Sequence, residues 1–201
     1  MKKGQSDLIS IVIIVGISIS LLSTAYFWGL PLIQKYQDTS KFKQIYSSFS
    51  PDNPSSLPNL IVELVRNGGS EEFNFPFEGG IELYEIENSI TFSFTSKVSG
   101  LAPDVGWVSL TKTGCSVSEG ILGVDKPYIV CAKSERKGDG FVITFNLTTR
   151  DLISDGTIYR IDLEKQTGSV SSSYSSKIRF TYEGKEETES LITYKIKVLL
   201  G

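Results

Sequence analysis

Two cysteines, one glycosylation sequon and a short polar leader are the parts of this chain that could take part in covalent chemistry. The sequence contains no histidine, which excludes imidazole bases and histidine metal ligands. The pairs Gly68-Gly69 and Gly79-Gly80 lack the Lys-Ser/Thr that completes a phosphate-binding loop. The acidic pairs Glu71-Glu72 and Glu186-Glu187 lie in no calcium-loop pattern, so we interpret them as solvated turns. The sequence predicts no enzyme, no metal site and no cofactor.

The cysteines, Cys115 and Cys131, form an even pair in the second half of the chain. In an oxidising compartment such a pair predicts a disulfide, closing a loop of roughly 15 residues and adding ~3 kcal/mol on the chain-entropy account. That loop would contain Gly120, Gly123 and Pro127. The alternative is two unpaired, small apolar side chains.

The sequon is Asn146-Leu147-Thr148. Asn146 alternates with Phe145 and Leu147 in a predicted strand, so its side chain is expected on the solvent face. There it could carry a glycan if this part of the chain lies outside the cell. The alternative is an ordinary polar strand residue.

The first structural element after the polar leader is an uncharged stretch from Leu8 to Gln34. As a helix it spans ~40 Å, more than the ~30 Å core of a bilayer. The end of this stretch contains Tyr26, Phe27, Trp28 and Pro31 but no Ala-x-Ala cleavage site, so we expect the stretch to be retained in the mature protein.

Small residues follow each other at every fourth position of this stretch, at Gly16, Ser20 and Thr24. On a helix they share one face, and small side chains at that spacing let two helix backbones approach closely. The sequence favours helix packing there. The alternative is that these residues are merely tolerated in a single membrane-spanning helix.

Beyond the apolar stretch, the aromatic and apolar positions Tyr36, Phe42, Ile45, Tyr46 and Phe49 have helical spacing, so the helix is expected to continue outward. The segment 50–58 is rich in Pro, Ser and Asn and predicts a linker. We expect a chain starting near position 55 to fold by itself.

After the linker, apolar and polar residues alternate, which is typical of half-buried antiparallel strands. The predicted strands are 60–65, 81–85, 90–95, 141–147, 158–162, 178–182 and 192–198. Turns are predicted at Asn67-Gly68-Gly69, Gly138-Asp139-Gly140, Asp155-Gly156 and Glu183-Gly184. The segment 169–176 is predicted to be a loop or a weak edge strand. This pattern predicts an all-β antiparallel sandwich, immunoglobulin-like or similar.

The chain carries 20 basic and 23 acidic residues. Because Lys2, Lys3 and Lys35 lie near the apolar stretch, the remaining domain is more acidic than the whole, which argues against nucleic-acid contact. The basic residues before the helix favour a cytoplasmic N-terminus and an outer β domain.

The opening residues Lys2-Lys3-Gly4, followed by Gln5-Ser6-Asp7 and the apolar stretch, resemble the class III signal of archaeal type IV pilin-like proteins. The resemblance covers about the first 35 residues. It implies cleavage between Gly4 and Gln5 by a prepilin peptidase. Many pilins carry Glu at the fifth mature position, which here is Ile9. The nearest acid is Asp7, which would have to pair with the new amino terminus.

The predicted organisation is a leader at 1–4, a transmembrane or filament-core helix at 5–49, a linker at 50–58 and an extracellular β-sandwich at 59–201. The resemblance implies a major or minor pilin of a surface filament. It would assemble through its helix with copies of itself and other pilin-like subunits, on an assembly platform. The alternative is a permanently anchored surface protein whose β domain binds an S-layer or appendage partner.

Overall fold

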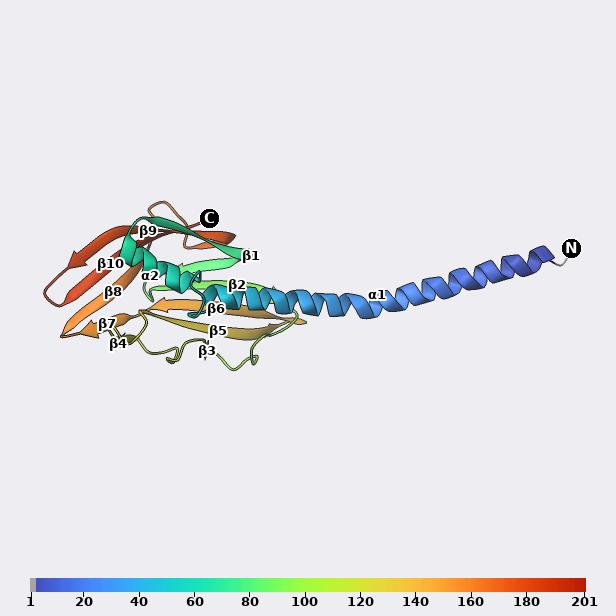
Figure 1. The fold of residues 1–201 in the computed structure, drawn as a ribbon, viewed down its shortest axis with the longest axis horizontal. Helices are drawn as coiled ribbons and strands as arrows, with labels where there is room; N and C mark the ends of the chain where they lie inside the picture. Colours follow the sequence, from blue (N-terminus) through green and yellow to red (C-terminus); the bar gives the residue numbers. More distant parts are fainter. Residues whose placement is uncertain (1–2) are drawn as a thin grey trace. The chain divides into compact units, whose positions relative to one another are not determined.

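The computed structural model describes the backbone of residues 3–201 and the side chains from Ser10 onward. The described elements are α1 (Lys3–Phe49), α2 (Leu57–Asn67), β1 (Ser70–Tyr84), β2 (Ser89–Ser96), β3 (Val108–Ser109), β4 (Glu119–Ile121), β5 (Tyr128–Lys137), β6 (Gly140–Thr149), β7 (Asp151–Ser154), β8 (Thr157–Lys165), β9 (Ser172–Glu187) and β10 (Leu191–Leu200). The chain forms two compact units, one ending at Ser40 and the other starting at Lys41 (Figure 1).

The second unit is built on one sheet with the strand order β3-β5-β6-β2-β1-β9-β10-β8-β7-β4. Its neighbours are antiparallel except for the pairs β10–β8 and β4–β7. The predicted long helix followed by an all-β domain is therefore confirmed. The sandwich-like packing arises within a single sheet that folds over on itself. Strands β6 and β8 have four other strands between them in that order, yet they touch, since the Thr149 hydroxyl donates to the Ile161 carbonyl at 3.0 Å.

Asn88, in the turn between β1 and β2, holds the two halves of this sheet together. Its Nδ2 donates to the Asp162 carboxylate at 2.9 Å, and its Oδ1 accepts from the Leu163 amide at 2.9 Å. Its backbone carbonyl accepts from the Thr149 amide at 3.0 Å. Asn88 has φ 49°, a left-handed conformation that Asn tolerates better than most residues.

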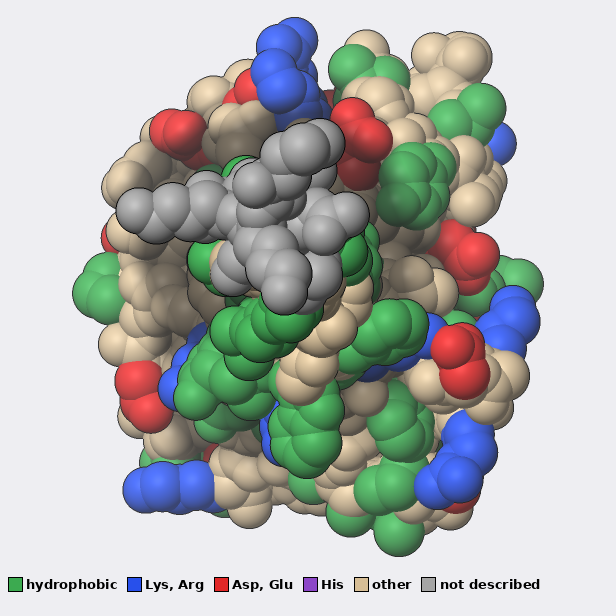
Figure 2. Space-filling view, turned by 90° about the vertical axis from the view of Figure 1, so that its right-hand side faces the viewer, with side chains coloured by type: hydrophobic (Ala, Val, Ile, Leu, Met, Phe, Trp, Pro, Cys, Tyr) green, Lys and Arg blue, Asp and Glu red, His purple; other side chains and the backbone are tan. Residues whose placement is uncertain are grey.

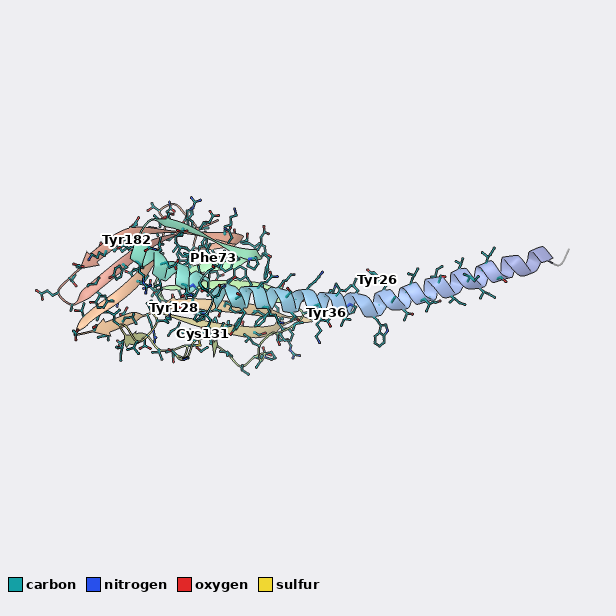
Figure 3. All side chains as sticks on the ribbon, in the orientation of Figure 1. Tyr26, Tyr36, Phe73, Tyr128, Cys131 and Tyr182 are labelled. Carbon is teal, nitrogen blue, oxygen red and sulfur yellow. A yellow bond between two sulfur atoms is a disulfide. The ribbon has the colours of Figure 1, made fainter. Side chains whose placement is uncertain are left out.

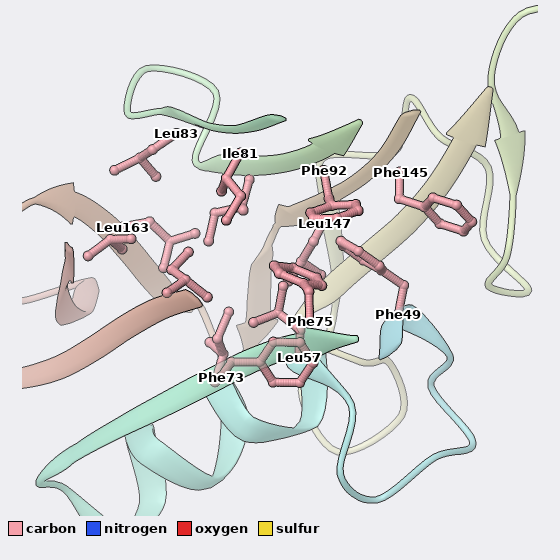
Figure 4. Packing of buried hydrophobic residues seen from close by; sticks show 14 of the residues in the cluster. Phe49, Leu57, Phe73, Phe75, Ile81, Leu83, Phe92, Phe145, Leu147 and Leu163 are labelled. Atoms are coloured by element: carbon pink, nitrogen blue, oxygen red, sulfur yellow. The ribbon is translucent and has the colours of Figure 1, made fainter. Parts of the chain in front are cut away.

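The inner face of the folded sheet is filled by α2 and by the last turns of α1. Phe49 stacks between Phe75 of β1 and Phe145 of β6, with ring centroids 5.8 and 5.3 Å apart (Figure 4). Phe75 in turn stacks on Phe92 at 4.2 Å. Ile45 and Phe49 are fully buried, so the end of α1 is part of the β domain's core.

Helix α2 corrects one prediction, since 60–65 was expected to be a strand. The alternating apolar residues there fit both structures, but the buried positions Leu57, Ile61 and Leu64 have the spacing of a helix face. Pro58 suits the first turn, where no amide hydrogen bond is lost. Gly68, with φ 71°, ends the helix by donating its amide to the Leu64 carbonyl.

The strand predictions at 90–95, 141–147, 158–162, 178–182 and 192–198 are confirmed. The predicted turn at Glu183-Gly184 is wrong: β9 continues through it, and the register against β10 shifts there in a bulge. Gly184 has φ 129°, which a glycine adopts without strain. The segment from Ser172 is part of β9, which lies between β1 and β10 and not at an edge.

Both edges of the sheet are formed by the same connection between β2 and β5. Within it, β3 pairs with β5 at one edge and β4 pairs with β7 at the other. Cys115 lies between β3 and β4 and forms a disulfide with Cys131 of β5. Short edge strands prevent pairing with other chains, and the disulfide ties the segment that provides both of them to the sheet.

We expect Cys115→Ser to lower the free energy of unfolding by about 3 kcal/mol, because the loop of sequence separation 16 would no longer be closed in the unfolded chain. Urea titration of the β domain followed by circular dichroism measures this. Ser116→Ala is the matched control and should leave the midpoint unchanged. A reducing agent should lower the urea midpoint of the unsubstituted protein to that of the Cys115→Ser variant. An unchanged midpoint in the presence of the reducing agent would contradict the prediction.

The packing also revises where the β domain begins. A chain starting at Lys41 keeps Ile45 and Phe49, whereas one starting at Ser55 loses both fully buried side chains. Removing a buried Phe or Ile costs about 2–5 kcal/mol each, which is comparable to the whole stability of a domain. We expect the chain from Lys41 to melt cooperatively and the chain from Ser55 to show little or no transition in thermal circular dichroism. Equal melting temperatures would show that the helix end is dispensable.

Candidate functional site

The candidate functional element is the apolar part of α1. Its large apolar side chains from Ile11 to Ile33 are 40–82% exposed. They follow one another on all sides of the helix, so no rotation of the helix hides them. By length and composition this helix can cross a membrane, which makes it suited to serve as an anchor or a signal. Such a surface is stable only in lipid or against other apolar helices.

Three hydroxyls in the middle of this helix have partners within the helix itself. Ser18 donates to the Ile14 carbonyl at 2.8 Å, and Ser20 to the Gly16 carbonyl at 2.9 Å. Thr24 donates to the Ser20 carbonyl at 2.8 Å. These i−4 bonds satisfy the hydroxyl donors without water, as an apolar surrounding requires.

The small residues Gly16, Ser20 and Thr24 occupy successive turns of one helix face. A Cβ built at Gly16 would meet no atom within 4 Å, so nothing inside the chain requires a glycine at this position. The face is available for another helix to approach. That it is used for helix packing stays a prediction.

Aromatic side chains mark the outer end of the apolar stretch. Tyr26, Phe27 and Trp28 are 66–82% exposed, and Figure 3 shows Tyr26 and Tyr36 projecting away from the helix. Between Leu8 and Trp28 a helix rises ~30 Å, the thickness of a bilayer core. Aromatic residues at that depth would lie at the membrane–water interface.

The predicted leader residues Gly4 and Gln5, and the acid Asp7, lie outside the residues whose side chains the structure describes. Cleavage and pairing of the amino terminus with Asp7 both stay predictions.

The structure contains the predicted Cys115–Cys131 disulfide, with the two Cα atoms 6.0 Å apart. Asn146 lies in β6 beside Cys131 of β5 and Thr91 of β2. Its Nδ2 donates to the Thr148 hydroxyl at 3.2 Å. Its Oδ1 is buried and has no hydrogen-bond partner in the described part of the chain. Asn146 is thus half-buried on the outer face, and the glycan stays a prediction.

The exposed face of the β domain carries ion pairs that bridge neighbouring strands. Lys197 of β10 contacts Glu164 of β8, and this hydrogen bond lowers the pKa of the Glu164 carboxyl. Arg160 binds Asp151 through two nitrogens at 2.9 and 2.6 Å, which raises the pKa of the guanidinium. In the view of Figure 2, basic and acidic side chains are interspersed. Among the described residues, no group of His, Cys, Asp and Glu is arranged to hold a metal ion.

Sequence reasoning missed the role of Phe42, Ile45 and Phe49 in the β domain, although their helical spacing was a signal for one buried face. Phe42 packs on Phe145 at 5.9 Å. It also lies so close to Gly100 that a Cβ there would come within 2.4 Å of its ring. The loop after β2 is thereby held on the helix end.

Comparison of the chain with protein-family models, with curated proteins and with solved structures found no match.

Proposed function

We propose that this chain is a structural subunit of an archaeal type IV pilus-like surface filament, assembled through the apolar part of α1. The observation that carries the proposal is a helix whose apolar side chains are exposed on every side between Ile11 and Ile33. Before assembly the helix lies in the membrane with the β domain outside. In the filament, like helices replace the lipid around it.

Two further observations support assembly through the helix. The stripe Gly16, Ser20 and Thr24 gives one side where backbones can approach closely. In contrast, the sheet ends in edge strands of two and three residues, β3 and β4, which offer little for the strand addition of another chain.

The second candidate is a permanently anchored surface protein whose β domain binds a partner. The aromatic residues Tyr26, Phe27 and Trp28, at a bilayer-matched distance from Leu8, favour it as strongly as they favour a membrane precursor. The two proposals differ in whether the leader is removed and whether the helix leaves the membrane.

Removal of the leader is the first property that distinguishes the two proposals. We expect native surface material to begin at Gln5, because Lys3-Gly4-Gln5 lies directly before the apolar stretch. Gly4→Val should block removal of the leader, since a β-branched side chain is unlike glycine at the cleavage position. N-terminal mass spectrometry of sheared surface filaments and of membranes measures this. Surface protein that retains residues 1–4 would contradict the filament proposal.

Assembly through the helix is the second property that distinguishes the two proposals. We expect Gly16→Leu to reduce filament yield strongly while leaving membrane insertion intact, because Leu is at least as apolar but keeps helices apart. Ala25→Leu is the matched control: at 3.6 residues per turn, position 25 lies on the face opposite to position 16. Electron microscopy of the two variants gives the outcome. Normal yield and diameter for Gly16→Leu would show that the small-residue stripe is not the packing surface.

A further inference from the structure

A groove in the β domain has no assigned role. It has a volume of about 770 Å³ and lies between α2, the segment Leu122–Tyr128 and strands β7, β8 and β10. Its floor includes Tyr159, Ile161 and Tyr194, and its α2 wall includes Val62. This volume lies within the range of sites that hold small ligands.

The wall opposite α2 is fixed by a buried arginine. Arg150, 5% exposed, donates through Nε to the Lys126 carbonyl at 2.8 Å and pairs with the Asp125 carboxylate at 3.3 Å. The second oxygen of Asp125 accepts from the Ile121 amide at 2.8 Å. The segment that closes the groove is therefore held in place without a ligand, which lowers the ordering cost of binding.

Two tyrosine side chains lie diagonally on the floor. In the parallel pairing of β10 and β8, Tyr159 is opposite Ile192 and Tyr194 is opposite Ile161, so both rings are on one face of the sheet. Neither phenol hydroxyl has a hydrogen-bond partner among the described residues, whereas the hydroxyl of Tyr128 donates to the Asn59 side chain at 3.0 Å. The groove thus offers two aromatic faces, each with a free polar tip.

The rim carries charges of both signs. Asp52, Glu63, Arg66 and Lys126 line the groove, and within the described part of the chain none of them forms an ion pair. An apolar ligand would leave the phenols and these charges without partners. An anion or a cation would face like charges as well as opposite ones.

We propose that this groove binds an uncharged saccharide of one or two sugar units. The C–H face of a sugar ring packs on Tyr159 and Tyr194, and its hydroxyls both donate to carboxylates and accept from Arg66, Lys126 and the phenols. The inference concerns the β domain alone and does not depend on whether the chain forms filaments.

The test is binding of the full chain, solubilised in the sugar-free detergent lauryldimethylamine oxide, to an array of neutral mono- and disaccharides. Saturation-transfer NMR with the methyl glycosides of mannose, galactose, glucose and N-acetylglucosamine then measures affinity. We expect binding of at least one sugar. Tyr194→Ala should weaken it about ten-fold or more, and Tyr194→Phe, which keeps the ring, about five-fold.

Tyr174→Ala is the matched control, because Tyr174 is 74% exposed on β9 and does not line the groove. It should bind like the unsubstituted chain. Circular dichroism of each variant checks folding, and Tyr194→Phe keeps the test valid if Tyr194→Ala unfolds. Two results would overturn the proposal: no neutral sugar bound by the unsubstituted chain, or the same affinity for the sugar in the unsubstituted chain and in the Tyr194→Phe variant.

Discussion

The β domain depends on the stacking of Phe49 between Phe75 and Phe145. A sheet that folds over on itself leaves an inner face that its own side chains do not fill, and the end of α1 supplies the missing volume. Truncating a buried phenylalanine typically costs about 3–5 kcal/mol, a large part of the stability of a domain this size. The same helix thus satisfies two different surroundings: it is apolar on every side before Ile33 and apolar on one face after Lys41.

The contacts between the two halves of the folded sheet follow from the packing of α1 and α2 on its inner face. With Phe49 and α2 inside, β8 comes near the β1–β2 turn, where the side-chain amide of Asn88 bonds to Asp162 and Leu163. The two edges are then covered by one disulfide-linked connection. The β domain exposes large apolar side chains such as Ile86, Val124 and Tyr174 in separate segments, whereas on α1 they follow one another from Ile11 to Ile33. The apolar surface that calls for a partner is concentrated on α1.

Local patterns predicted much of this fold, and non-local packing accounts for what they missed. The uncharged stretch identified α1, and strict alternation identified β2, β6 and β10. Strand β5 has its apolar residues in one run, from Tyr128 to Ala132, because both of its faces are covered there. Helix α2 was mistaken for a strand because an alternating apolar stretch of six residues fits either period.

The candidate sites likewise fall into two groups, those contained in short stretches of sequence and one assembled from distant segments. The stripe at Gly16, the cysteine pair and the sequon are patterns within short stretches, so the sequence predicts them, although it cannot show that Asn146 is half-buried. The groove is assembled from α2, the segment before β5 and three strands distant in the sequence. Tyr159 and Tyr194 are 35 positions apart in the chain and become neighbours only through the parallel pairing of β8 and β10. No local pattern contains that information.

The free energy of covering α1 exceeds the free energy of folding the domain attached to it. Each large apolar side chain moved out of water gains about 1.5–3 kcal/mol, so the side chains from Ile11 to Ile33 together account for tens of kcal/mol. A domain is stable by only about 5–15 kcal/mol, so the helix determines where the chain resides. Lipid and a bundle of like helices both provide this cover, so exchanging one for the other changes the hydrophobic term little. The choice between them then rests on close contacts between backbones, which lipid cannot make and which the small-residue face of α1 permits.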